Sequence, residues 1–293
     1  GGAIRQVMPT RVIVVFDGKD ASASRRKIYS DYKANRGGNA LSRVNRVYGQ
    51  LTDDEERKQM KKELIMSTKF LSLLPVTVMV YPRIEADDVM AYISREMCED
   101  RSVLMSSDKD FLQLVNEDTS VWSPSKHKLY TPDLLMEEYG IPFDNFLLFR
   151  MIDGDKSDNV GGIRGLGLKT LIKRFPIITE EKLTIDDIIA YAEEQDSKLT
   201  KSKKIKVYQT VMESRDILVR NKSLMDLEVG TINGLFKLKI QDRFRADIPR
   251  LKRHSFERRL VSEGMADSMP GMQSWMHTVF KPLDRYANES DEG

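Results

Sequence analysis

Three short apolar runs rich in β-branched residues, separated by helical segments, constrain the fold of this chain most. The runs span residues 12–16, 76–80 and 102–106 and read VIVVF, VTVMV and SVLMS. Between the last two, apolar residues at positions 89, 93 and 97 recur at the spacing of an amphipathic helix. Strands that alternate with helices predict an α/β domain with a mainly parallel sheet. Sites in such sheets form beyond the carboxyl ends of the strands.

Acidic residues follow these apolar runs instead of lying in polar loops. They form four clusters, which are Asp17; Glu85, Asp87 and Asp88; Asp108 and Asp110; and Asp155 and Asp158. Eight carboxylates at one edge of a sheet would repel one another unless cations neutralised them. Oxygen ligands of this kind suit Mg²⁺, and two such ions can activate water and stabilise the leaving oxygen of a phosphodiester. Taken singly, residues 85–88 could instead cap a helix, and residues 153–159 could form a turn or a calcium loop.

The distribution of charge points to a polyanion as partner. The formal net charge is +2, but residues 25–62 carry a net +6, residues 85–158 a net −10 and residues 161–263 a net +7. An acidic middle between basic flanks indicates metal-binding carboxylates beside a surface for a polyanion. The alternative is a set of solvated faces whose charges segregate by chance.

The scarcity of cysteine and histidine excludes several other kinds of site. The single cysteine, Cys98, cannot form an internal disulfide or build a cysteine-based zinc site. The three histidines lie far apart and match no zinc motif. No apolar run is long enough to span a membrane, and no signal peptide is recognisable. We therefore expect a soluble cytoplasmic protein that contacts no membrane.

A glycine-rich segment, NVGGIRGLGLK at residues 159–169, predicts a backbone turn that can approach a phosphate. Gly162, Gly165 and Gly167 would form a hairpin between two helices, and the amides at the start of the second helix could bind an anion. Lys169 and Lys173 lie four residues apart on that helix, where they could follow a nucleic-acid strand. A Rossmann or P-loop site would need a strand before the glycines, and an acidic turn precedes them here. A plain glycine-rich connection remains the alternative.

Five motifs occur in a fixed order between residues 10 and 224. They read VVFDGK, YKANR, IEADDVMAYI, SSDKDFLQL and FRMIDGDKSDNVGGIRGLGLKTL. In these motifs and their order the chain resembles the 5′-nuclease family, which includes bacteriophage 5′–3′ exonucleases, flap endonucleases and the N-terminal nuclease domain of bacterial DNA polymerase I. The resemblance implies a PIN-like parallel-sheet core over residues 1–158 with a helical arch at 37–74. It also implies a helix–three-turn–helix DNA-binding subdomain at 159–228, followed by a C-terminal extension at 229–293.

The same resemblance implies two metal-ion sites. Asp17, Glu85, Asp87, Asp108 and Asp110 match the tighter acidic set, Asp88 matches a neighbouring acidic position that supports it, and Asp155 and Asp158 match the pair for the second metal. The implied ions are Mg²⁺, with Mn²⁺ as a substitute.

The resemblance also implies contacts with DNA. Lys33 and Arg36 match basic residues that contact the scissile phosphate, and Tyr32 matches a residue that stacks on a terminal base. Arg150 matches a basic position one helix before the second acidic pair. The carbonyls of the glycine hairpin match a family site for K⁺ held against a DNA phosphate. Without the shared motif order, each of these residues would be an ordinary surface charge or a packed tyrosine.

One departure from the family pattern concerns the N-terminus. The family begins with a short strand that ends in an aspartate, followed by a helix, before the strand matched by residues 12–16. This chain begins too late for either, and no carboxylate precedes Asp17. We therefore expect the first family strand and its metal ligand to be missing from this chain, either because the chain is a fragment or because the protein lacks that ligand.

The resemblance implies a monomeric, Mg²⁺-dependent, structure-specific 5′–3′ exonuclease and flap endonuclease. It would act on 5′ flaps, nicked or branched duplexes and RNA-primed DNA in replication and repair, and leave a 5′-phosphate and a 3′-hydroxyl. Its setting would be a bacterial or phage-infected cell. One alternative is a protein that binds branched DNA without cutting it, because the first aspartate is missing. Another is an RNA-cleaving nuclease with a related acidic core, which should lack the glycine hairpin.

Overall fold

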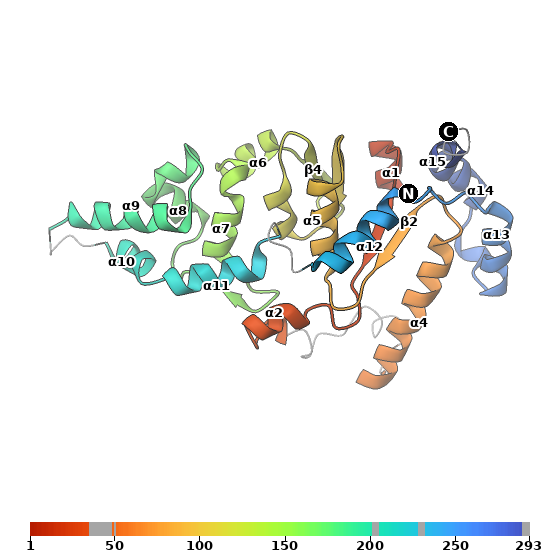
Figure 1. The fold of residues 1–293 in the computed structure, drawn as a ribbon, viewed down its shortest axis with the longest axis horizontal. Helices are drawn as coiled ribbons and strands as arrows, with labels where there is room; N and C mark the ends of the chain where they lie inside the picture. The colour runs from red at the N-terminus through yellow and green to blue at the C-terminus, as the bar shows by residue number, and fades with distance from the viewer. Residues whose placement is uncertain (35–48, 50, 201–204, 228–231, 289–293) are drawn as a thin grey trace. The chain divides into compact units, whose positions relative to one another are not determined.

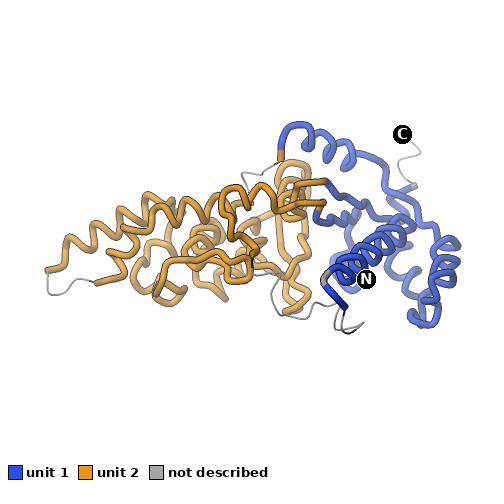
Figure 2. The backbone as a smooth tube through the Cα atoms, turned by 90° about the horizontal axis from the view of Figure 1, so that it is seen from below, with its two compact units in different colours: residues 1–17, 37–81, 233–293 blue, residues 18–36, 82–232 orange. Residues whose placement is uncertain are grey.

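The computed structural model describes residues 1–34, 49, 51–200, 205–227 and 232–288, and it divides into two compact units. Unit 1 contains residues 1–17, 37–81 and 233–293, and unit 2 contains residues 18–36 and 82–232 (Figures 1 and 2). The chain therefore passes between the units several times. The predicted functional division at residues 158 and 228 follows other boundaries and stays a prediction.

Unit 1 contains the first two predicted strands. β1 (Ile13–Phe16) pairs in parallel with β2 (Thr77–Val80), in a register that sets Ile13 opposite Thr77. A short helix, α1 (Gly2–Val7), precedes β1. The expectation that the chain begins too late for a helix before this strand is therefore wrong, because residues 2–7 close helical hydrogen bonds even though Gly2 is among them.

Helix α4 (Asp53–Leu71) is the described part of the predicted arch region. It begins at a capping box in which the Thr52 side chain accepts from the amide of Glu55, and the Glu55 carboxylate accepts from the amide of Thr52. Residues 37–48 and 50 of the arch region lie outside the described residues.

The C-terminal part of the chain completes the core of unit 1. Its elements are α12 (Gly234–Arg245), α13 (Arg253–Ser262), η6 (Ala266–Ser268), α14 (Met272–Trp275), the π-helical η7 (Met276–Phe280) and α15 (Lys281–Asn288). Met276, Val279 and Phe280 are buried in one apolar cluster with Leu74 and Val76, which flank the start of β2. Residues 272–280 are therefore helical and packed into the core of unit 1.

Unit 2 contains the third predicted strand in a separate sheet. β3 (Ser102–Met105) pairs in parallel with β4 (Thr119–Ser123), and β4 pairs antiparallel with β5 (Lys128–Tyr130). Helix α5 (Ala86–Glu96) precedes β3, and the 3₁₀ helix η2 (Lys109–Leu114) follows it. Parallel pairing is confirmed, but the strands lie in two short sheets instead of one.

Local sequence signals set the two ends of helix α6 in unit 2. α6 (Pro132–Tyr139) begins where the Thr131 side chain accepts from the amide of Leu134, with Pro132 in the first turn. It ends at Gly140, whose φ of +66° is in the left-handed region that glycine favours. The other elements are α2 (Ala23–Ile28), η3 (Phe143–Asn145), α7 (Phe146–Asp153), β6 (Gly154–Asp155), β7 (Val160–Gly161), α8 (Leu168–Arg174), η4 (Pro176–Thr179), α9 (Ile185–Ser197), α10 (Lys206–Met212) and α11 (Arg215–Met225).

Helix α7 lies at the centre of unit 2 and fixes the segment that follows it. Phe146, Phe149 and Tyr139 pack in edge-on or tilted ring pairs, and Ile152 is fully buried. α11 packs along α7 (Figure 1). A helix buried on nearly all sides holds the acidic loop at its C-terminal end in a defined place. Within the described part of the chain, no helix combines the length and apolar character needed to cross a membrane.

Candidate metal and nucleic-acid site

Three carboxylates from distant parts of the sequence converge in unit 2. One oxygen from each of Asp108, Asp110 and Asp155 lies within 4.8 Å of the others. Asp108 caps η2 by accepting from the amide of Asp110 at 2.9 Å, and Asp155 ends the short strand β6. Three converging carboxylates are a donor set that hard divalent cations such as Mg²⁺ prefer. These residues therefore fit the metal that the sequence implies.

A buried arginine lies between two of these carboxylates. The Nε of Arg150 donates to Asp110 at 2.7 Å, one Nη donates to Asp155 at 2.8 Å and the other to the carbonyl of Gly154 at 3.1 Å. Arg150 is only 3% exposed, so its guanidinium neutralises the carboxylates from inside the protein. Its predicted contact with DNA stays a prediction.

The carboxylates on either side of Arg150 differ in their affinity for a proton. Burial raises the pKa of Asp110 to about 6, with Arg150 opposing the shift and Asp108 adding to it. Burial also acts to raise the pKa of Asp155, but hydrogen bonds from Ser157 and the charge of Arg150 together bring it below its ordinary value. Asp155 is therefore an anion throughout the neutral range, whereas Asp110 begins to take up a proton as the pH falls towards 6.

This difference predicts a pH-dependent effect of Asp110→Asn on the stability of the protein in chelator. The pKa of Asp110 in the folded protein lies above its ordinary value of 3.8. The favourable contribution of the protonated Asp110 side chain to the free energy of unfolding is therefore fully present below pH 3.8, and it is lost as the pH rises through about 6. At pH 7.5 we expect the variant to have a higher Tm than the parent, by an amount equivalent to about 2–3 kcal/mol, and the difference should vanish near pH 4.

Thermal unfolding followed from pH 4 to pH 8 measures this difference. Asp153→Asn is the matched control, since it removes the same charge from a side chain that is 39% exposed. A difference between the parent and Asp110→Asn that did not change with pH would contradict the raised pKa.

A second polar cluster joins Lys33, Tyr32, Glu85 and Asp158. The Lys33 Nζ lies 2.7 Å from a Glu85 oxygen and 3.8 Å from an Asp158 oxygen. The backbone amide of Lys33 donates to the carbonyl of Asp158 at 2.9 Å, and Lys33 has a φ of +57°. The turn at Lys33 therefore brings its ammonium group to the carboxylates, and the structure brings together three residues that the sequence assigns to the site.

Tyr32 lies in this cluster, but its ring is not available for base stacking. Its hydroxyl donates to Glu85 at 3.3 Å and to Asp158 at 3.2 Å, and the residue is 4% exposed. The ring packs against Val160 and Leu224. Burial and the neighbouring charges of Glu85 and Asp158 raise the pKa of Tyr32, so the hydroxyl is a neutral donor. The prediction that Tyr32 offers an open face to a base is therefore corrected for this structure.

Sequence patterns did not reveal a second buried arginine, Arg25 on α2. It donates to Glu85 at 2.5 Å and to the two oxygens of Asp88 at 2.7 and 2.9 Å. The only signal in the sequence is a basic run, in which nothing separates Arg25 from its exposed neighbours Arg26 and Lys27. Arg25 becomes recognisable only when the fold brings α2 against the start of α5.

Asp17, Asp87 and Arg36 are among the predicted site residues that the structure does not place in either cluster. Asp17 directly follows β1 in unit 1, so its convergence with the carboxylates of unit 2 stays a prediction. Asp87 is partly exposed on the first turn of α5 and does not belong to the three-carboxylate cluster. Arg36 lies outside the described residues.

The glycine-rich turn is shaped by close backbone packing. A side chain on Gly162 would come within 2.3 Å of the Ile152 carbonyl and 2.4 Å of Asp153, and Gly165 has a φ of +82°. Gly167, at the start of α8, has open space around its Cα. The short β6–β7 hairpin lies between α7 and this turn, which leads into α8.

The basic side chains on and after this turn face solvent. Lys169 and Lys173 are exposed on α8, and Arg164 is exposed in the turn itself. The spacing predicted for the two lysines is present, and Arg164 adds a third cation that the sequence analysis did not single out.

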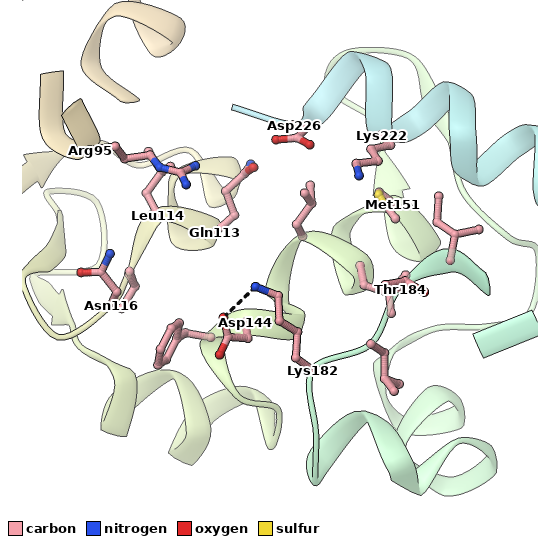
Figure 3. Close-up of a pocket in the computed structure, with 16 residues that line it drawn as sticks. Arg95, Gln113, Leu114, Asn116, Asp144, Met151, Lys182, Thr184, Lys222 and Asp226 are labelled. Carbon is pink, nitrogen blue, oxygen red and sulfur yellow. Dashed lines mark hydrogen bonds and ion pairs between the residues drawn. The ribbon is translucent and has the colours of Figure 1, made fainter. Parts of the chain in front are cut away.

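A cavity of about 390 Å³ in unit 2 is lined by none of the candidate carboxylates (Figure 3). Arg95, Gln113 and Lys222 line it, together with Lys182, which forms an ion pair with Asp144 at 3.3 Å. The candidate chemistry of unit 2 is therefore found in the two polar clusters and not in this cavity.

The N-terminal part of the chain is similar to a known family. Residues 2–140 match the family described as 5′–3′ exonuclease, N-terminal resolvase-like domain. This match covers a little under half of the chain. The converging carboxylates at Asp108 and Asp110 lie within the matched residues, and Asp155 lies just after them.

Two curated relatives extend the similarity beyond these residues. A 5′–3′ exonuclease of Aquifex aeolicus is 30% identical over 171 residues, which cover 58% of this chain and 53% of that protein. The thermostable DNA polymerase I of Thermus filiformis is 32% identical over 166 residues, which cover 55% of this chain and 17% of that protein. The chain thus matches about half the length of one relative and about a sixth of the other.

A solved structure shows the fold of the larger part of the chain. It is a bacteriophage T5 flap endonuclease in complex with DNA and metal ions, with a TM-score of 0.59 and 21% identity, covering 91% of this chain and 88% of that one. The predicted α/β nuclease fold of the PIN-like type is confirmed.

Proposed function

We propose that this chain is a structure-specific 5′-nuclease that hydrolyses DNA phosphodiester bonds with Mg²⁺, as a 5′–3′ exonuclease and flap endonuclease. The observation that carries the proposal is the convergence of Asp108, Asp110 and Asp155 within 4.8 Å. The match of residues 2–140 to the 5′–3′ exonuclease domain family supports it. The metal ions and DNA bound by the bacteriophage T5 flap endonuclease support the same cofactor class and partner.

In this proposal the two polar clusters have different tasks. Asp108, Asp110 and Asp155 would hold one divalent cation, and Glu85 and Asp158 would contribute to a second position, with Mn²⁺ able to replace Mg²⁺. This grouping exchanges Glu85 and Asp155 between the two acidic sets that the family resemblance implies, because Asp155 lies with Asp108 and Asp110. When bound, such ions activate water and stabilise the leaving oxygen of a phosphodiester. The chain itself fixes the carboxylates before the ions arrive, because Arg150 holds Asp110 and Asp155 in place.

The DNA would be recognised through its backbone and shape. Exposed Arg164, Lys169 and Lys173 present positive charge at the glycine turn, where phosphate contacts position a duplex without reading its sequence. The carbonyls of this turn are also proposed to hold a K⁺ ion against a phosphate. Affinity for DNA should therefore fall steeply as the salt concentration rises. The expected substrates are 5′ flaps, nicked or branched duplexes and RNA-primed DNA, which arise in replication and repair.

Cleavage of a 5′-labelled flap substrate tests the proposal. We expect labelled product with Mg²⁺ and none with chelator. The released labelled flap should end in a 3′-hydroxyl, and the trimmed strand should begin with a 5′-phosphate. Matched RNA flaps measure the preference for DNA. If the protein bound the flap but released no product at any Mg²⁺ concentration, it would be a branched-DNA-binding protein and the nuclease proposal would be wrong.

A further inference from the structure

We propose that Arg25 and Asp88 form a buried positioning pair, which fixes the Glu85 carboxylate for metal binding without contributing a ligand of its own. The inference rests on the proposed function, since it takes Glu85 as a metal-binding residue. It assigns a role to Arg25, which has none so far, and gives Asp88 the task of holding Arg25 instead of a cation.

The contacts of Asp88 carry the first step. Both of its oxygens accept from the Arg25 guanidinium, at 2.7 and 2.9 Å, and the residue is 1% exposed. Two parallel hydrogen bonds from one guanidinium fix the plane of the carboxylate as well as its position. A buried carboxylate held in this way has both oxygens turned towards the arginine, so it fixes the position of the arginine side chain.

The contacts of Arg25 carry the second step. Besides Asp88, its Nε donates to the carbonyl of Leu224 at 2.7 Å, near the C-terminal end of α11. These two partners determine the orientation of the guanidinium. One Nη, which also donates to Asp88, then donates to Glu85 at 2.5 Å. Arg25 is 3% exposed, so water does not screen the interaction.

The surroundings of Glu85 carry the third step. One of its oxygens accepts from Arg25 and Tyr32, and the other accepts from Lys33. A buried carboxylate that binds a metal needs partners of this kind, because they fix its orientation. Among these partners, Arg25 is the one whose own position is fixed, by the Asp88 carboxylate and by the backbone carbonyl of Leu224 on α11.

Charge balance makes the pair testable by a double-mutant cycle. Arg25 and Lys33 face Glu85, Asp88 and, at 3.8 Å from Lys33, Asp158. Removing Arg25 alone leaves Asp88 buried without this cation, and removing Asp88 alone leaves the Arg25 guanidinium buried without its bidentate partner. Removing both takes away one charge of each sign, so the net charge of the cluster stays that of the parent.

The first measurement is thermal unfolding in chelator of Arg25→Met, Asp88→Leu and the double variant. We expect each single variant to lower Tm by about 10 °C and the double variant to recover most of this loss. Arg26→Met is the matched control, because Arg26 is the next residue on α2 and is exposed. It should leave Tm nearly unchanged. Single variants whose losses simply add in the double variant would overturn the pairing.

The second measurement is Mn²⁺ binding by calorimetry, which needs neither DNA nor cleavage. A positioning role predicts that the double variant, although stable again, binds Mn²⁺ about tenfold to a hundredfold more weakly and cleaves a flap more slowly by a similar factor. A double variant that binds Mn²⁺ like the parent would show that the pair only stabilises the fold. If the parent binds Mn²⁺ but cleaves no flap, the nuclease proposal fails, and the calorimetry still decides the role of the pair.

Discussion

Replacing Asp155 by asparagine should abolish cleavage of a flap substrate while leaving its affinity for DNA near the parental level. Asp155 contributes one oxygen to the converging carboxylates, and its pKa lies below the ordinary value, so it is an anion at every pH at which a nuclease would be assayed. Asparagine keeps the shape of the side chain but loses the charge that a divalent cation requires. Because the residues of a catalytic centre act as a unit, we expect the rate to fall by roughly a thousandfold or more.

Affinity should not fall with the rate, because DNA is a polyanion and the substitution removes a negative charge from the protein. Single-turnover cleavage with saturating enzyme measures the rate, and a binding titration in Ca²⁺ or chelator measures affinity. Asp153→Asn is the matched control, since it removes the same charge two residues away from a side chain that is more exposed than that of Asp155. Parental cleavage by Asp155→Asn would refute the metal assignment.

Short-range patterns in the sequence predicted the elements and the acidic centre well. Apolar β-branched runs located β1, β2 and β3. Asp108 and Asp110 were predicted to meet Asp155 because acidic residues after apolar segments collect at one edge of an α/β fold. Each of these predictions depends on residues close together in the sequence, or on a general property of the fold class.

The partners of the carboxylates could not be predicted, because they depend on which side chains the tertiary fold brings inside. Arg25 reaches Glu85 and Asp88 from sixty or more positions earlier in the chain, and nothing in its local sequence distinguishes it from Arg26. The same holds for Gln113, whose side chain donates to the carbonyl of Met225 more than a hundred residues away. Burial of the Tyr32 ring and the separation of the strands into two sheets likewise depend on packing between distant segments.

Replacing Lys33 by alanine should slow the chemical step far more than it weakens DNA binding. Its ammonium group lies 2.7 Å from Glu85 and 3.8 Å from Asp158, in a side chain that is 11% exposed, so its charge acts in a poorly screened environment. A fixed cation beside the reacting phosphate stabilises charge that develops only in the transition state. Loss of one such group costs roughly a hundredfold to a thousandfold in rate, whereas loss of one phosphate contact among many changes affinity by only a few fold.

Lys27→Ala provides the matched control, because Lys27 is exposed on α2 and its removal changes the net charge equally. Rate and affinity are measured for both variants over a series of salt concentrations.

A charge that acts only by attracting DNA would lower affinity and rate together in Lys33→Ala, and its effect would disappear at high salt. A charge that acts in the transition state leaves a rate defect that persists when the enzyme is saturated with DNA. Equal losses of rate and affinity would therefore show that Lys33 acts only by attracting DNA. A defect confined to the rate would place it beside the reacting phosphate, because Glu85 still has Arg25 as a counter-ion when Lys33 is gone.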